Sequence, residues 1–213
     1  MKSRVGSYLL FCVLAAAGCR SASYWAWEKL GVQKRDLLKK NVVAARDDQK
    51  AASDQFKDAL TRLKELTGFQ GGDLEKTYNG LNRDYERSVE RANAVHSRVK
   101  DVEQVAADLF KEWEHEDKEI SSPDLREKSR QQLRETRQRY DELHAALKRA
   151  EDSMDPVLTR LHDQVLFLKH NLNAAAIASL KGESTNIQAE ISSLLQDMNA
   201  SIAQADKFIN AMP

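Results

Sequence analysis

The sequence has little of what interrupts a helix. Among 213 residues there are three prolines and eight glycines, and aromatic residues make up only 7%. Sheets need β-branched residues and frequent turns that contain glycine or proline, so this scarcity argues against strands. Charged residues, at 31%, are plentiful, and with abundant alanine, leucine and glutamine they are typical of long helices. We therefore predict an all-α protein with few loops that could carry a catalytic site.

The chain also lacks an excess of charge of one sign. Its 33 lysines and arginines balance its 33 aspartates and glutamates, so no global field attracts an acidic polymer. We expect no nucleic-acid partner. Cysteine is scarce as well, because the chain has two, and both stand near its start.

The first eighteen residues have the pattern of a signal peptide. Lys2 and Arg4 make a short basic start, and residues 5–17 carry no charge. Such a stretch is too short to span a membrane, which takes about 20 apolar residues, but it suits the apolar region of a secretory signal. We expect residues 1–18 to be removed.

Small residues at 15–18 precede Cys19 and resemble a bacterial lipobox, in which the thiol of the cysteine after the cut receives the lipid. One departure is Ala16, where lipoboxes favour leucine. Alternatively, an ordinary signal peptidase cuts after the A-x-A site at 15–17 and leaves Cys19 free. We predict lipidation of Cys19, which would leave no free thiol because Cys12 departs with the signal.

These features predict a location on the periplasmic face of a bacterial envelope membrane. Residues 19–23 would form a short lipidated tether. Arg20 favours the outer membrane, because aspartate at that position retains enterobacterial lipoproteins in the inner membrane. Trp25 and Trp27 follow at once, either as aromatics at the depth of the lipid headgroups or as an apolar cap on the end of a helical bundle.

From there on, apolar residues recur at alternating steps of three and four, the pattern of a coiled-coil seam. The first seam runs through Leu38, Val42, Ala45, Gln49, Ala52, Phe56, Ala59, Leu63 and Leu66. The second runs through Leu74, Tyr78, Leu81, Tyr85, Ser88, Ala92, Val95, Val99, Val102, Ala106, Leu109 and Trp113. The third runs through Leu133, Thr136, Tyr140, Leu143, Leu147, Ala150, Met154, Val157 and Leu161. The last contains Ile187, Ile191, Leu194, Met198, Ala205 and Phe208.

Turn and cap residues divide these seams into helices. Glycines at 68–72 end the first seam, and Asp73 is a plausible N-cap for the second. Ser122 can cap the third helix, with Pro123 in its first turn.

Two further boundaries follow from the third and last seams. The steps from Val157 to Leu161 and from Leu161 to Val165 are both of four residues, so the alternation of three and four is broken there. Such a stutter near Pro156 predicts a kink, or a restart of the helix with Asp155 as its cap. Gly182 is the expected C-cap. We predict one elongated antiparallel coiled-coil bundle over residues 24–213, with three to four long helices at about residues 24–67, 73–119, 123–181 (kinked near 156) and 185–211.

Few residues have the spacing of a chemical site. Glu112 and His115 have the Glu-x-x-His spacing of di-iron bundles, and Asp141 with His144 is the nearest second pair. The seam points Trp113 inward and leaves this pair at the flank, so a solvated charged face is the better interpretation. We expect no metal, cofactor, catalytic residue or small-molecule substrate.

The most unusual stretch is Asp163–Leu180, whose apolar residues cannot all share one stripe of a helix. Either several helices converge there and bury it all round, or it is an interaction surface for a partner helix or for self-association. In the second case Phe167 is the apolar contact, and His170 and Asn171 are polar residues that select the partner.

This stretch, together with Trp25–Gly31, Phe69–Leu74 and Leu109–Glu114, resembles an uncharacterised family of bacterial lipoproteins catalogued as a domain of unknown function. The resemblance covers essentially all of the mature chain. It implies an exported, helical, lipid-anchored protein with no assigned activity, and it carries over no catalytic residue.

The resulting hypothesis is a lipid-anchored envelope scaffold or adaptor that is not an enzyme. Its partners would be the membrane, through the lipid anchor, and a protein or a second copy of the chain. The alternative is a helical protein of the membrane surface that binds or remodels lipid. That function would need a contiguous basic or aromatic face.

Overall fold

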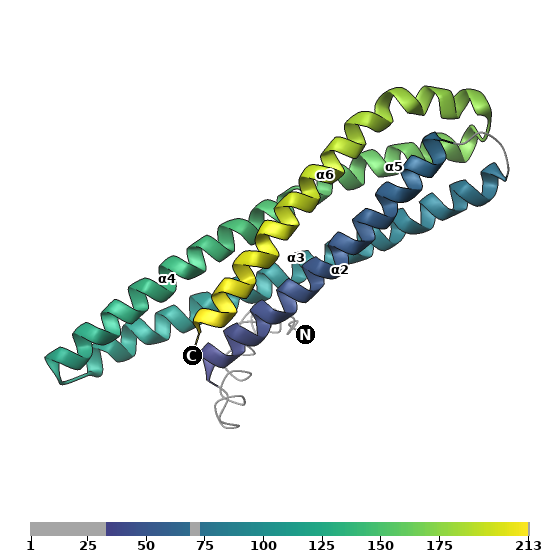
Figure 1. The fold of residues 1–213 in the computed structure, drawn as a ribbon. Helices are drawn as coiled ribbons and strands as arrows, with labels where there is room; N and C mark the ends of the chain where they lie inside the picture. Colours follow the sequence, from purple (N-terminus) through teal and green to yellow (C-terminus); the bar gives the residue numbers. More distant parts are fainter. Residues whose placement is uncertain (1–32, 69–72, 213) are drawn as a thin grey trace, which may run out of the picture.

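The computed structural model describes residues 33–68 and 73–212, and every regular element in that part of the chain is an α-helix. The prediction of an all-α protein is therefore confirmed. The helices lie side by side as a bundle (Figure 1). They are α2 (Lys34–Thr67), α3 (Leu74–Glu119), α4 (Pro123–Asp152), α5 (Met154–His170) and α6 (Ala174–Ala211).

Two of the expected helix starts are confirmed by their capping bonds. Asp73 precedes α3, and its Oδ1 accepts a hydrogen bond from the backbone N–H of Lys76 at 2.9 Å. Ser122 precedes α4, where its Oγ accepts from the N–H of Leu125 at 3.5 Å. Pro123 is the first residue of α4, where a missing N–H removes no helical bond.

The predicted seams form the core of the bundle. All nine seam residues of α2 are buried, including the polar Gln49. Most of the second seam is buried too, while Leu74, Tyr78, Tyr85 and Trp113 are half-buried. The main apolar cluster draws residues from all five helices. A smaller cluster closes one end of the bundle and contains Leu66, Leu81, Val165, Leu168, Ile177 and Leu180.

The expected boundary at Gly182 is wrong, because this residue lies inside α6. The chain breaks earlier, where α5 ends at His170 and Asn173 caps α6 by accepting from the N–H of Ala176 at 2.9 Å. Apart from the neighbouring backbone of α6 itself, nothing lies within 4 Å of where a Cβ on Gly182 would stand, so this glycine costs only about 1 kcal/mol of helix propensity. The Asn173 cap stabilises the start of α6 by a similar free energy.

The interruption expected near Pro156 lies three residues before it. Ser153 separates α4 from α5, and Asp155 is a helical residue, not the cap. Pro156 is the third residue of α5, where its missing N–H has no partner in the helix anyway. The Ser153 Oγ lies 2.9 Å from both the Arg149 carbonyl and Asp197 Oδ2 of α6, so this break is tied across the bundle.

Candidate functional site

The stretch expected to be either buried or an interaction surface lies at the end of the bundle where α5 turns into α6. Three of the four exposed large hydrophobic side chains in the described residues are here: Leu166 (44% exposed), Phe167 (40%) and Leu172 (39%). Val165 and Leu168 are buried on the opposite side of the same helix. Burial all round is therefore wrong, because α5 presents one apolar face to the core and a second to solvent.

The polar residues predicted for this surface lie at the same end. His170 is the last residue of α5 and is exposed, as is Asn171. The Asn171 side-chain amide donates to the carbonyl of Phe167 at 2.9 Å, and its backbone N–H donates to Leu168 O at 3.1 Å. Asn171 thus closes the C-terminus of α5, and the turn brings Phe167, His170 and Asn171 together.

An open groove of about 480 Å³ lies between α5 and α6 beside this surface. Its lining combines apolar, amide and charged side chains: Arg160, Asp163, Gln164, Phe167, Ser179, Leu180, Glu183 and Ile187. Glu190 Oε2 lies 2.9 Å from Arg160 Nε, an ion pair without hydrogen-bond geometry. The charges of the groove are therefore of both signs.

Gln164 is the functional candidate that the sequence analysis missed. Its side chain is 2% exposed, and neither its Oε1 nor its Nε2 has a hydrogen-bond partner. A step of three from Leu161 lands on Gln164, and a further step of four reaches Leu168. The regular seam thus continues through the polar Gln164. The stutter was expected because only apolar residues were counted as seam positions.

The residues with metal-like spacing do not come together. Glu112 pairs with Lys34 of α2 at 2.5 Å, and His115 lies 3.5 Å from Glu119 on its own helix. The His144 Nε2 lies 2.7 Å from Glu103 of α3. In the described residues no group of three or more histidine, cysteine, aspartate or glutamate side chains could hold a metal ion.

Three histidines join α3 to the helices that follow it. His144 does so through Glu103, and the ring of His162 on α5 stacks on Tyr85 of α3 at 5.3 Å between centroids. The two ring nitrogens of His96 lie beside Glu151 of α4 and Asp155 of α5. Spacing within one helix could not reveal these contacts, because each partner lies on another helix.

Tyr140 is the centre of an aromatic cluster between α3, α4 and α6. Its ring contacts Phe110 at 5.5 Å, His144 at 5.7 Å and Phe208 at 6.5 Å between centroids. Burial, with the nearby carboxylates of Glu103 and Asp141, raises the pKa of Tyr140 to about 12. The phenol therefore stays neutral at physiological pH, and the cluster packs α3, α4 and α6 together.

A family model described as "Protein of unknown function (DUF2959)" matches residues 23–212. The chain belongs to this family. The predicted membership of a family catalogued as a domain of unknown function is thereby confirmed, and the match covers almost all of the predicted mature chain. Among curated proteins, none matches significantly. Since DUF2959 has no assigned activity, the evidence for a site is the geometry above.

The predicted membrane-proximal residues lie outside the described part of the chain. These are Cys19, the tether at 19–23, and Trp25 and Trp27. Among the helices that the structure does describe, none is both long and apolar enough to cross a lipid bilayer.

Proposed function

We propose that this DUF2959 protein is a lipid-anchored structural or interaction protein of the bacterial cell envelope, a scaffold or adaptor without catalytic activity. The observation that carries the proposal is the surface formed by Leu166, Phe167 and Leu172 at the turn between α5 and α6. Single exposed apolar side chains are ordinary, but clustered ones mark contact sites. Phe167 also lines the adjoining groove, so a partner side chain has a place to enter.

We further propose that the bundle is an elongated antiparallel coiled coil. Along α2 and α3, ion pairs repeat after fourteen residues, or two heptads, in opposite directions on the two helices. They are Lys34–Glu112 (2.5 Å), Asp48–Arg98 (3.0 Å) and Arg62–Asp84 (3.3 Å). Between α2 and α6 the same opposed order joins Arg46 to Asp206 at 3.0 Å and Lys39 to the Met212 carbonyl at 3.2 Å.

The apolar surface lies far from the start of α2. The helix α2 has 34 residues and is about 51 Å long at 1.5 Å per residue. Its first residues follow the proposed anchor, and Leu66 near its end packs with Val165 and Leu168. The surface of Leu166, Phe167 and Leu172 therefore lies at the opposite end of α2 from Lys34, where the described helix begins after the proposed anchor.

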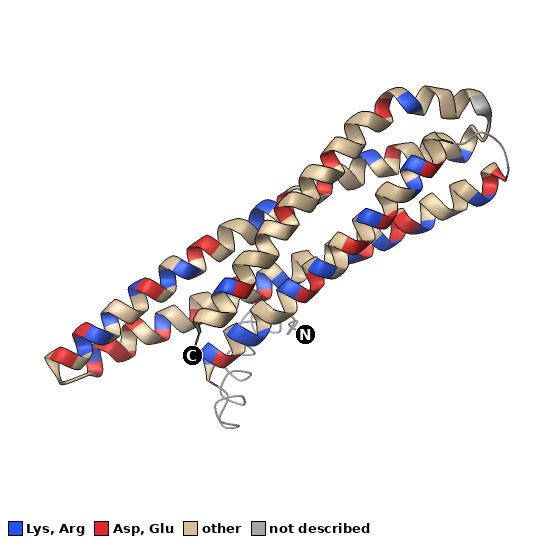
Figure 2. Cartoon of the chain, in the orientation of Figure 1, with Lys and Arg blue, Asp and Glu red and all other residues tan. Residues whose placement is uncertain are grey.

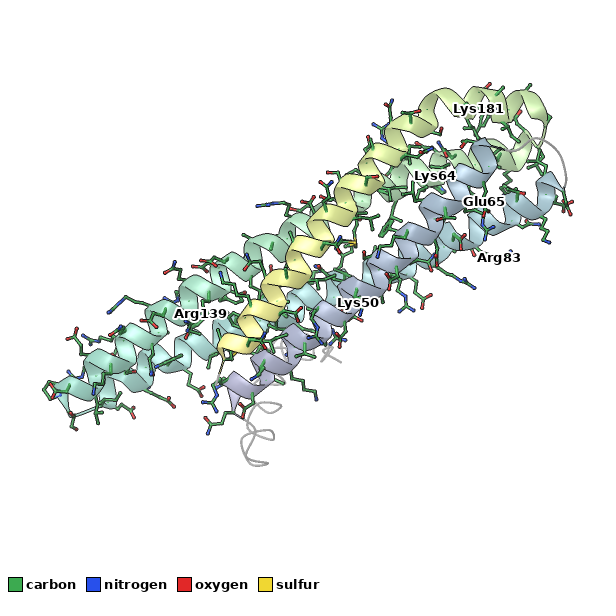
Figure 3. The ribbon with its side chains drawn as sticks, in the orientation of Figure 1. Lys50, Lys64, Glu65, Arg83, Arg139 and Lys181 are labelled. Atoms are coloured by element: carbon green, nitrogen blue, oxygen red, sulfur yellow. The ribbon has the colours of Figure 1, made fainter. Side chains whose placement is uncertain are left out.

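Charge distribution favours a protein partner over lipid. Figure 2 shows positions of lysine and arginine interspersed with those of aspartate and glutamate along the helices in view. Lys50 and Arg83, both labelled in Figure 3, are exposed. A lipid-binding face needs a concentration of positive charge or of aromatics, so binding to membranes is the alternative outcome of the test.

The test is a crosslinking comparison in intact cells with a photoreactive amino acid at position 167, and with the same amino acid at position 83 as the control. Both positions are exposed. We expect a discrete protein adduct from position 167, and loss of that adduct when Leu166 and Leu172 are changed to serine. The same adducts from both positions would contradict the proposal. Adducts with lipid alone would support the alternative.

A further inference from the structure

One cross-section in the middle of the bundle contains both a break between helices and several polar contacts. Ser153 interrupts the α4–α5 line there, and its Oγ contacts Asp197 of α6. On the other side of the bundle, Arg98 of α3 donates to Asp48 of α2 at 3.0 Å. Since His96 lies one half-turn from Arg98 on α3 and contacts Glu151, the break and these pairs belong to one cross-section.

The core at this level contains buried polar atoms without partners. They are Oε1 and Nε2 of Gln49 and the Oγ atoms of Ser53 and Ser201. The Arg46–Asp206 bond sets the register of α2 against α6, and it places Gln49 and Ser201 close to the same height. A buried polar atom without a hydrogen bond costs about 1–3 kcal/mol. The core is therefore weaker here than in the apolar layers above and below.

His96 spans the break from the facing helix. Its Nδ1 lies 2.8 Å from Glu151 Oε1 on α4, and its Nε2 lies 3.3 Å from Asp155 Oδ1 on α5. Glu151 is buried, whereas the Asp155 side chain is 71% exposed. One imidazole thus connects α3 to the last turn of α4 and to the first turn of α5.

The chemistry of this contact requires two protons on the ring. An ionised carboxylate is only an acceptor, and a neutral imidazole has one N–H donor and one acceptor nitrogen. In the neutral form, a nitrogen lone pair would face a carboxylate oxygen. Both contacts are favourable together only when His96 is an imidazolium.

The contacts of His96 belong to a larger network of charged groups. The charged groups near His96 come from all the neighbouring helices: Lys148, Glu151 and Asp152 on α4, Asp155 on α5, Asp197 on α6 and the Arg98–Asp48 pair of α3 and α2. The ammonium of Lys148 contacts Glu151 and Asp152.

We propose that His96 is a proton-operated clamp on a hinge at the α4–α5 junction. Doubly protonated, it holds α4 and α5 against α3 on both sides of Ser153. Loss of one proton turns one attraction into a repulsion, and the exposed Asp155 is the partner released. Histidine side chains change charge between about pH 5 and 8, so the clamp is closed at the acidic end of this range and opens as pH rises.

Hydrogen exchange of the full chain, followed by mass spectrometry at about pH 6 and pH 8, tests the clamp. Rates are corrected for the pH dependence of chemical exchange. In the wild type we expect peptides across 147–160 to exchange about two- to fivefold faster at pH 8, the range for a partly exposed ion pair. Peptides across 113–130 should show no such change. Absence of a pH effect at 147–160 would overturn the proposal.

Three variants assign the effect to His96. His96→Gln should exchange fast at both pH values, and His96→Lys, which keeps a cation, should exchange slowly at both. His115→Gln, on the same helix but paired only with Glu119, should behave as the wild type. If His96→Gln fails to fold, Asp155→Asn replaces it and should remove most of the pH effect. A wild-type pH response in His96→Gln or in Asp155→Asn would overturn the clamp.

Discussion

Arg62 of α2 donates from its Nε to Asp84 Oδ2 of α3 at 3.3 Å, and Gly80 lies directly beneath this bond. A Cβ on Gly80 would stand 3.0 Å from Arg62 Nε and 3.2 Å from its Cδ. The glycine therefore leaves room for the arginine to reach a carboxylate that is nearly buried. The Arg62 side chain, which passes over Gly80, therefore explains why a glycine stands inside α3.

Removing this arginine should destabilise the bundle. In Arg62→Ala, Asp84 stays buried without its cation, and we expect a loss of about 1–2 kcal/mol in the free energy of unfolding. The neighbouring exposed Arg83→Ala is the matched control and should change it by less than about 0.5 kcal/mol. Urea denaturation followed by circular dichroism measures both. Equal losses in the two variants would mean that the Arg62–Asp84 bond is not stabilising.

Gly80→Ala should have different effects in two backgrounds. In the wild type the new methyl group displaces Arg62 and offsets the gain in helix propensity. In Arg62→Ala that obstacle is gone, and alanine should stabilise α3 by about 1 kcal/mol. The coupling free energy of the double-mutant cycle measures this difference. A coupling free energy near zero would show that the Arg62 side chain moves away from the new methyl group without a loss of stability.

Gln164→Leu should stabilise the protein, because leucine fills a similar volume without two buried polar atoms that lack partners. We expect a gain of about 1–3 kcal/mol, seen as a rise in the thermal midpoint. Gln132→Leu, at an exposed position of α4, is the control and should leave the midpoint nearly unchanged. A lower midpoint for Gln164→Leu would indicate that the amide has a partner in solution.

Acid should weaken the hairpin of α3 and α4 through Asp117. The hydrogen bond from Arg130, at 2.8 Å, is the main cause that lowers the pKa of Asp117 from its ordinary 3.8. Because the folded-state pKa is the lower one, the bond contributes stability above about pH 4 that is lost as pH falls through the folded-state value. Thermal midpoints measured between pH 6 and pH 2.5 should fall less steeply in Asp117→Asn. Parallel curves for the two proteins would remove Asp117 as a cause.

The mature N-terminus should begin at Cys19 and carry acyl chains. Mass spectrometry of protein purified from membranes should find a modified N-terminal peptide, and Cys19→Ser should release the protein from the membrane fraction. Detection of an unmodified peptide beginning at Gly18 would instead indicate the A-x-A cut and would remove the anchor from the proposed function.

The helices and their core faces were predictable because their signal is local. A helix buries one face along its whole length, so the seam residues of α2 could be read from their spacing alone, down to the polar Gln49. The same reading failed at Gln164, where a polar residue in the seam was taken for a change of phase. It also failed at Gly182, because propensity alone does not show that Asn173 caps a longer helix.

For the candidate site, the sequence located the stretch but not its exposure. That Phe167 belongs to an unusual apolar run was visible in the sequence, since its neighbours could not share one stripe. Which of these residues face solvent depends on how many helices pack around α5 at that end. The partners of His96 were beyond sequence reasoning for a similar reason, because Glu151 is 55 residues away and meets it only through packing.

By itself, then, the sequence determined the class of fold, the inward faces and the family, because helix periodicity and motifs are properties of short segments. Only the tertiary structure decided where the α4–α5 line breaks, which apolar side chains remain in water and which carboxylates surround His96. Those features depend on the register of one helix against another. That register is set by contacts between residues far apart in the chain, so no local pattern of residues encodes it.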